Sequence, residues 1–287
     1  MRTLTADQLV RAVQRGERIA GYTVRGQRLA GAQLAGADLS QIDLGNSDLS
    51  GANLAGCRFN QTELGQVRLT NADLSGCDLR SAKLDFSDLQ GANLSKARLL
   101  GTSLVRVNLS GANLAEAQLH HVNLGEANLT KADLRGAAIQ DQCDLHGTVL
   151  REAILYKADL SECDLKGSDL TGAIIREARL RRSNLQGASL AGVNLIGADL
   201  SGTDLTDAKL PRADLRAANC WCCCFRNADL RAADFRGARL VWADLTGSTI
   251  DGAAFQEAVF SNDPTRRTLF PGGFDPAQHG MLVVQPV

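Results

Sequence analysis

The stretch LQGASLAGVNLIGADL, residues 185–200, contains the pattern that decides the fold. From Leu185 onward, a leucine stands at every fifth position of this stretch. The same apolar spacing covers residues 24–139 and 145–260, which makes 48 five-residue units with a single break in phase. A short, strict period of this kind predicts one elongated repeat domain in which each unit packs on its neighbours.

The consensus of one unit, A-(D/N)-L-x-x, predicts a short extended piece followed by a corner. Ala37, Asp38 and Leu39 are an example. Side chains two residues apart lie on the same side of an extended segment, so the small and large apolar residues face inward while Asp or Asn faces outward. Frequent glycines before the next unit favour a turn. A five-residue spacing drifts around a helix, which excludes helix from the repeat body.

These units resemble the pentapeptide-repeat family over roughly residues 19–260. The resemblance implies an all-β fold, a right-handed quadrilateral parallel β-helix of about 12 coils, with four units in each coil. One coil would place four large residues around its core: Leu185, Leu190, Leu195 and Leu200. It also implies a bacterial protein, because the family is abundant in photosynthetic bacteria.

The two ends of the repeat need covers, because an open solenoid exposes apolar layers and unpaired strand edges. Residues 1–18 are expected to form a short N-terminal helical cap, since Thr5 and Gln8 fit a capping box ahead of an apolar face. The period stops beyond Phe260, and residues 261–287 are expected to fold back as a C-terminal cap or tail. One extra residue near 140–144 predicts a local bulge at one corner.

Composition restricts the partners and the compartment. Lys plus Arg number 31 and Asp plus Glu number 32, so the chain has no overall field that would attract nucleic acid or an anionic membrane. No stretch has the length of a signal peptide core or a membrane span, which predicts a cytoplasmic protein. The stacked pairs Cys57/Cys77 and Cys143/Cys163 occupy an inward repeat position and are expected to be reduced core thiols.

No catalytic or cofactor motif rises above the repeat. The Cys220–Cys224 run includes spacings that bind zinc, but Cys220 and Cys223 occupy the two inward positions while Cys222 and Cys224 face outward, so the four sulfurs cannot converge without breaking a coil. Adjacent His120 and His121 diverge in an extended piece, and no phosphate-binding loop occurs. We therefore expect no enzyme, no cofactor and no metal. A redox- or metal-responsive protein built on the cysteine run is the third alternative.

Outward residues 20 apart should stack in columns. One column alternates in charge, through Asp38, Arg58, Asp78 and Arg98. Opposite charges at strand spacing attract, so this column is interpreted as a register device. Some members of the family protect DNA gyrase by acidic mimicry of duplex DNA. Here the acidic residues are interleaved with arginines, although one partly acidic column keeps gyrase or topoisomerase modulation as the alternative function: Asp144, Asp164, Asp204 and Asp244.

Two outward patches are candidate partner-binding surfaces. The first joins both tryptophans of the chain, Trp221 and Trp242, with Val241 and Arg239. Exposed tryptophan and arginine often dominate binding energy at interfaces. The second is an apolar strip bordered by arginine: Ile154, Tyr156, Ile174, Arg176 and Ile196.

The function expected from this pattern is a non-catalytic protein-protein interaction scaffold that presents rigid side-chain columns. Its partner is an unknown protein, or a second copy joined through the C-terminal coils as a homodimer. A C-terminal tail packed over Trp221 and Trp242 is the alternative use of the first patch. A tolerated solvated face is the alternative interpretation of the second.

Overall fold

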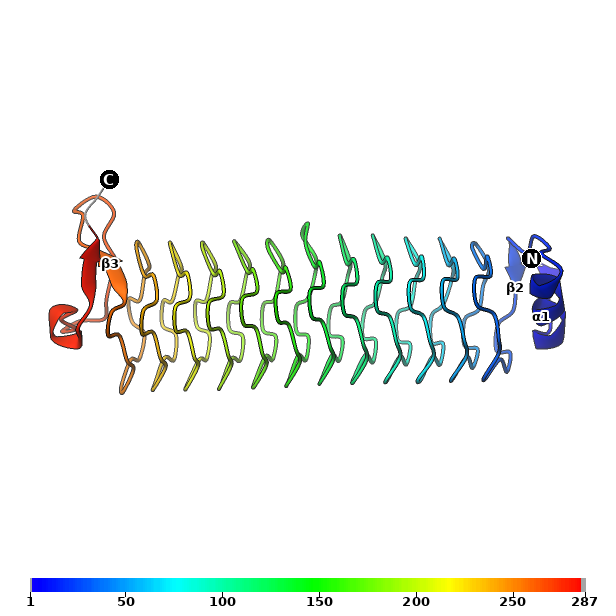
Figure 1. The fold of residues 1–287 in the computed structure, drawn as a ribbon, viewed down its shortest axis with the longest axis horizontal. Helices are drawn as coiled ribbons and strands as arrows, with labels where there is room; N and C mark the ends of the chain where they lie inside the picture. The colour runs from blue at the N-terminus through cyan, green and yellow to red at the C-terminus, as the bar shows by residue number, and fades with distance from the viewer. Residues whose placement is uncertain (1, 285–287) are drawn as a thin grey trace. The chain divides into compact units, whose positions relative to one another are not determined.

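The computed structural model describes residues 2–284 (Figure 1). These residues divide after Thr148 into two compact halves, residues 2–148 and residues 149–284. The named elements lie near the chain ends: β1 (Arg2–Thr3), α1 (Ala6–Gln14), β2 (Tyr22–Thr23), β3 (Val259–Ser261), the 3-10 helix η1 (Ala277–His279) and β4 (Leu282–Val284). Within the described residues α1 is the only α-helix, so the exclusion of helix from the repeat body is confirmed.

The repeat is a β-helix solenoid held by parallel backbone pairing between successive coils. The outward residue of one five-residue repeat pairs with the residue 20 positions later in the chain. Asp38 pairs in this way with Arg58, and Ile154 with Ile174. The N–H of Leu39 also donates to the carbonyl of Arg58 at 2.8 Å. An offset of 20 residues equals four five-residue units, so the columns read from the sequence are stacked columns of the structure.

The interior consists of the large and small residues that the pattern placed inward. Leu54 and Cys57 are fully buried, as is Thr62. Several small polar side chains at the inward position donate to the preceding coil: Thr62 Oγ1 donates to the carbonyl of Leu39 at 2.8 Å and Cys57 Sγ to that of Leu34 at 2.9 Å. Such bonds remove the cost of burying a hydroxyl, so Ser, Thr and Cys replace Ala without disrupting the layer.

Most corners are tight turns closed by a backbone hydrogen bond. The N–H of Ala32 donates to the carbonyl of Leu29 at 3.0 Å, and Gly31 between them has φ 68°. The outward Asp or Asn also caps the turn: Asn53 Oδ1 accepts from the N–H of Ala55 at 3.3 Å. This Asx-type bond gives a physical reason for the repeated Asp or Asn, beyond its solvent-facing position.

The predicted bulge absorbs the extra residue in the first half. The pairing offset rises to 21 between Asn123 and Asp144, and Asp141 and Gln142 both have left-handed backbones, with φ 64° and 61°. His120 Nδ1 lies 3.0 Å from Asp141 Oδ2 at this corner. In the second half of the chain, backbone pairing at an offset of 20 residues is again present from Val149 onward.

The N-terminal helix forms as the sequence predicts. Thr5 Oγ1 accepts from the N–H of Gln8 at 3.3 Å, and Gln8 Oε1 accepts from the N–H of Thr5 at 2.8 Å, so both halves of the capping box are present. Leu9 is fully buried, and the N–H of Ala6 donates to Gln27 Oε1. These contacts join α1 to the first repeats.

The C-terminal segment differs from the expectation that the period stops at Phe260. After β3 the chain leaves the ladder and returns to it at Leu269, which pairs with Asp244 at an offset of 25. Thr268 Oγ1 then donates to the carbonyl of Leu240, as inward hydroxyls do elsewhere. The segment therefore adds a further ladder position after a loop with five extra residues. β4 then pairs in parallel with β3, so the tail does add a strand.

Candidate protein-contact surface

Trp221 and Trp242 form one aromatic pair in the second half. Their ring centroids lie 5.1 Å apart with the ring planes tilted by 46°. Trp221 follows the inward residue Cys220, whereas Trp242 stands at a corner two residues after Leu240. Trp221 is 37% exposed, and Trp242 is half-buried. The structure therefore brings together the two tryptophans that the sequence placed on one face.

The loop that follows β3 contacts Trp242 and leaves Trp221 exposed. The Arg266 guanidinium carbon lies 4.9 Å from the centre of the Trp242 ring, a cation–π distance. Thr268 Oγ1 accepts from the N–H of Trp242 at 3.2 Å and donates to the carbonyl of Leu240 at 2.7 Å. The tail therefore covers part of the pair.

Val241 is a correction to the sequence prediction. It follows an inward leucine and was expected to face outward, but it is 6% exposed. Its backbone carbonyl accepts from the N–H of Cys222 at 3.0 Å, so it supports the surface without extending it. Arg239 is exposed as expected. Trp242 has φ 64°, a backbone conformation that costs strain for a bulky side chain.

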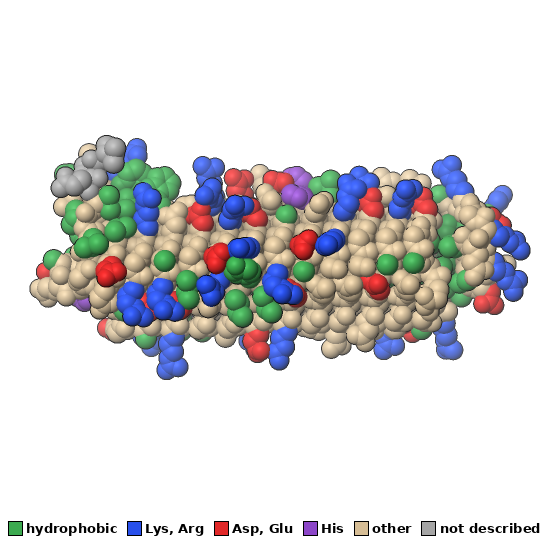
Figure 2. Space-filling model, viewed as in Figure 1, with side chains coloured by type: hydrophobic (Ala, Val, Ile, Leu, Met, Phe, Trp, Pro, Cys, Tyr) green, Lys and Arg blue, Asp and Glu red, His purple; other side chains and the backbone are tan. Residues whose placement is uncertain are grey.

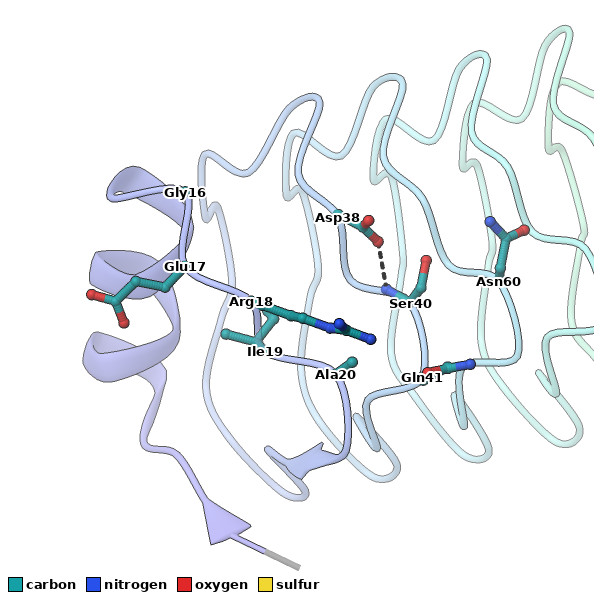
Figure 3. Close-up of a pocket in the computed structure, with 9 residues that line it drawn as sticks. All are labelled: Gly16, Glu17, Arg18, Ile19, Ala20, Asp38, Ser40, Gln41 and Asn60. Atoms are coloured by element: carbon teal, nitrogen blue, oxygen red, sulfur yellow. Dashed lines mark hydrogen bonds between the residues drawn. The ribbon is translucent and has the colours of Figure 1, made fainter.

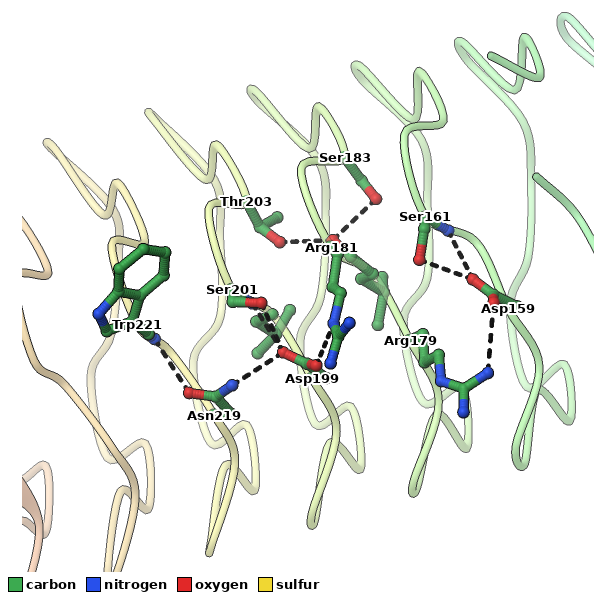
Figure 4. Close-up of polar contacts among 12 residues, drawn as sticks. Asp159, Ser161, Arg179, Arg181, Ser183, Asp199, Ser201, Thr203, Asn219 and Trp221 are labelled. Atoms are coloured by element: carbon green, nitrogen blue, oxygen red, sulfur yellow. Dashed lines mark hydrogen bonds and ion pairs between the residues drawn. The ribbon is translucent and has the colours of Figure 1, made fainter. Parts of the chain in front are cut away.

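A line of hydrogen bonds along the column fixes the backbone of Trp221 (Figure 4). Asn219 Oδ1 accepts from the N–H of Trp221 at 3.4 Å, and Asn219 Nδ2 donates to Asp199 Oδ1 at 3.0 Å. Asp199 also accepts from Ser201 and Arg181. Burial raises the pKa of Asp199, but the hydrogen bonds from Ser201 and Arg181 outweigh it, and the net pKa is lowered. The carboxylate stays charged and holds the column in place.

The Ile154 strip is more tightly tied to its own neighbours. Ile154 pairs with Ile174, which is 40% exposed, and both Tyr156 and Ile196 are half-buried. The Tyr156 hydroxyl donates to Glu177 Oε2 at 3.4 Å, and Lys157 Nζ lies 5.0 Å from the Tyr156 ring centre.

Arg176 in this strip is exposed and lies 3.9 Å from the Glu177 carboxylate. The polar groups of this strip therefore already have partners within the chain.

The cysteine run has the alternation expected from the repeat. Cys220 and Cys223 are buried, whereas Cys222 and Cys224 are half-buried thiols. Cys223 Sγ donates to the carbonyl of Leu200 at 2.7 Å. Among residues 2–284 no group of three or more His, Cys, Asp or Glu side chains is placed to hold a metal ion.

The five-residue repeat matches a known protein family. A model of the family described as pentapeptide repeats matches most of the sequence, over residues 28–66, 62–101, 102–139, 143–182, 183–219 and 223–262. The chain belongs to the pentapeptide-repeat family.

Several solved structures are similar to this pentapeptide-repeat protein. HetL from the cyanobacterium Nostoc sp. strain PCC 7120, a pentapeptide repeat protein involved in heterocyst differentiation regulation, is 30% identical, with 89% of this chain and 96% of HetL covered and a TM-score of 0.36. QnrB1, a plasmid-mediated fluoroquinolone resistance protein, is 20% identical, with 72% and 88% covered and a TM-score of 0.44. A search of curated proteins gave no match.

Opposite charges are interspersed over the visible face of this pentapeptide-repeat protein (Figure 2). The partly acidic column is interrupted, because Asn184 and Cys224 alternate with its aspartates in the pairing ladder. Asp244 in that column is bound by Arg226 at 2.5 Å. No described helix has the length and apolarity needed to cross a membrane.

A groove of about 440 Å³ lies beside α1 in the first half (Figure 3). Arg18, Asp38, Gln41 and Asn60 line it. Asn60 Oδ1 is buried there and accepts no hydrogen bond. Exchanging the oxygen and nitrogen of this amide would change which atom is buried, so this atom alone does not define a ligand.

Proposed function

We propose that this protein is a non-catalytic interaction scaffold that presents a rigid surface to a protein partner, with Trp221 and Trp242 at the centre of the contact. The observation that supports the proposal is the partly exposed tryptophan pair on a hydrogen-bonded ladder. The proposal includes the architecture behind this surface: 48 units wound as about 12 right-handed, four-sided coils.

The physical basis is preorganisation. Large aromatic side chains supply much of the binding energy at protein interfaces. Ordering mobile side chains on binding costs about 0.5–1.5 kcal/mol each. The ring contact and the Arg266 stack restrain the two side chains before a partner arrives, and the Asn219 and Thr268 bonds hold their backbones. Little ordering cost then remains to be met by the complex.

The remaining parts of the proposal are a cytoplasmic location, no cofactor, and a protein as partner. A second copy of the chain is the other candidate occupant. Gyrase modulation has no support from a continuous acidic surface, because the aspartates are interleaved with arginine and neutral residues.

The test compares two sets of variants. The double variant Trp221→Ala, Trp242→Ala should fail to capture a specific partner that the wild-type protein captures from native lysate. Once purified, that partner should bind the wild-type protein and not the double variant. Phe86→Ala is the matched control, because Phe86 is a 54% exposed aromatic residue in the other half. Circular dichroism should show that both variants keep the fold. Equal binding of the purified partner by the double variant and the wild type would contradict the proposal.

A further inference from the structure

Arginines around the tryptophan pair differ from most others in the second half because they lack a carboxylate partner. Residues 149–284 contain 13 arginines, of which four have no Asp or Glu oxygen within 4.0 Å among the described residues: Arg212, Arg239, Arg266 and Arg267. Arg266 contacts Trp242 directly, Arg267 follows Arg266 in the chain, and Arg239 is the ladder partner of Asn219, two residues before Trp221. Most arginines of residues 149–284 are neutralised by a nearby carboxylate, whereas the arginines near the tryptophan pair are not.

The three arginines come from two segments, the ladder and the loop that follows β3. Arg239 pairs on the ladder with Asn219, the residue that binds the backbone of Trp221. Arg266 stacks on Trp242 from the loop that follows β3, and the exposed Arg267 is its neighbour in that loop. Asp263 interacts electrostatically with Arg266 but forms no ion pair with it within 4.0 Å among the described residues, and its Oδ1 accepts from Thr265 Oγ1 at 2.6 Å.

We propose that the Trp221–Trp242 surface docks an acidic peptide segment of a partner protein. Its carboxylates would pair with Arg239, Arg266 and Arg267, and an apolar side chain would pack on the exposed face of Trp221. This inference rests on the proposed function and names the chemistry of its partner. An incoming carboxylate displaces no internal ion pair here, whereas it would have to do so at most other arginines of this half.

The aromatic geometry leaves no room for a base between the two rings, and the oligonucleotide probe below tests whether a base stacks on the exposed face of Trp221 instead. A base inserted between two rings needs about 7 Å between their planes, twice the stacking distance of about 3.4 Å. The centroids of Trp221 and Trp242 are only 5.1 Å apart, with the planes tilted by 46°. The two rings therefore offer one apolar face and no slot for stacked bases.

Intrinsic fluorescence tests the proposal directly, because the chain contains only these two tryptophans. The full chain is titrated with a short synthetic peptide of alternating glutamate and leucine. A lysine–leucine peptide of the same length and a thymidine oligonucleotide of similar charge serve as comparison probes. We expect a saturable change in emission with the acidic peptide alone, and weaker binding at high salt, because exposed charge pairs are screened.

Matched arginine variants locate the charge effect. Changing Arg239, Arg266 and Arg267 together to Gln should lower the affinity for the acidic peptide by about 3- to 100-fold, the range expected for the loss of three exposed ion pairs. Arg212→Gln is the control, because Arg212 also lacks a carboxylate partner but lies on another face. Circular dichroism confirms that both variants fold.

Several outcomes would overturn the inference: no saturable change, equal binding of the lysine peptide or the oligonucleotide, or an unchanged affinity in the triple variant. A concentration-dependent dimer in sedimentation that the triple variant loses would assign the surface to a second copy instead. The failures are distinguishable. If the acidic peptide does not bind but the double tryptophan variant still loses its purified partner, the contact surface stands and the acidic chemistry is wrong.

Discussion

At the residue scale, the outward Asp or Asn of each unit has more roles than its position suggests. The sequence predicts that it faces solvent, because it lies between two inward residues. In the structure its side chain also closes the turn, and an Asn can donate to the coil before it. Asn113 does both: its Oδ1 accepts from the N–H of Ala115 at 3.0 Å, and its Nδ2 donates to Asn93 Oδ1 at 3.1 Å. Periodicity gives facing but not hydrogen bonding, which explains why this role was missed.

Asn113→Ala should therefore lower the free energy of unfolding by about 1–3 kcal/mol, the net worth of two hydrogen bonds. Gln118→Ala is the control, because Gln118 occupies the same outward position in the next unit and its side chain makes no described hydrogen bond. Chemical denaturation measures both. An equal loss in the two variants would show that the side-chain bonds of Asn113 contribute little.

The buried thiols give a second prediction at this scale. Cys57 and Cys77 are free thiols, as predicted. Burial raises their pKa to about 11 and about 12. The thiolate is the reactive form, so both should resist alkylation at pH 8 in the native protein, whereas the half-buried Cys222 should react first. Mass spectrometry after brief iodoacetamide treatment measures this order, with the unfolded chain as control. Labelling of Cys57 as fast as Cys222 would contradict it.

At the element scale, a helix start can be predicted from a few adjacent residues, whereas an insertion as long as one repeat cannot be detected from the periodicity. Thr5 and Gln8 predict the start of α1 because a capping box depends on four adjacent residues. The loop after β3 cannot be seen in the periodicity, because its five extra residues equal one period. Phe270 therefore remains in phase with Phe260, although the residues between them do not fit the consensus. Arg266 was absent from the predicted site for that reason, because only the folded loop places it on Trp242.

The capping box can be tested on α1 itself. Thr5→Ala should destabilise the helix by about 0.5–2 kcal/mol, because the N–H of Gln8 loses its acceptor. Gln8→Glu is the conservative control, since a carboxylate can still accept from the N–H of Thr5. Amide hydrogen exchange at Leu9 and Ala12 measures the effect locally. Unchanged protection in Thr5→Ala would mean that burial of Leu9 alone holds the helix.

At the scale of the whole molecule, the ladders of opposite charge are only part of the electrostatics. The predicted column pairs exist, as between Arg98 and Asp78 at 3.8 Å. Asp78 makes a shorter contact with Arg80, two residues along its own strand, at 2.6 Å. A spacing of 20 residues does not reveal this contact, because its two partners are only two residues apart. Repeated pairs of this second kind hold many carboxylates charged.

Acid sensitivity follows from those pairs. Hydrogen bonds from Arg80 and Arg135 lower the pKa of Asp78 and Asp133, respectively. A carboxyl whose pKa is lower in the folded state stabilises the fold above its unfolded pKa, about 3.9, and loses that contribution as the pH falls through the folded value. We therefore expect these groups to contribute a constant stability from pH 8 to about pH 5, and to lose it below about pH 4.

The variant Asp133→Asn isolates one such group. Asparagine keeps an oxygen to accept from the N–H of Arg135, as Asp133 Oδ1 does at 3.1 Å, but it does not titrate. Denaturation curves measured across the acid range should therefore show a smaller loss of stability below about pH 4 than the wild type. Gln118→Asn removes no carboxylate and should keep the wild-type slope. An unchanged slope in Asp133→Asn would mean that the Asp133–Arg135 pair does not stabilise the fold, and that the acid response comes from other carboxylates.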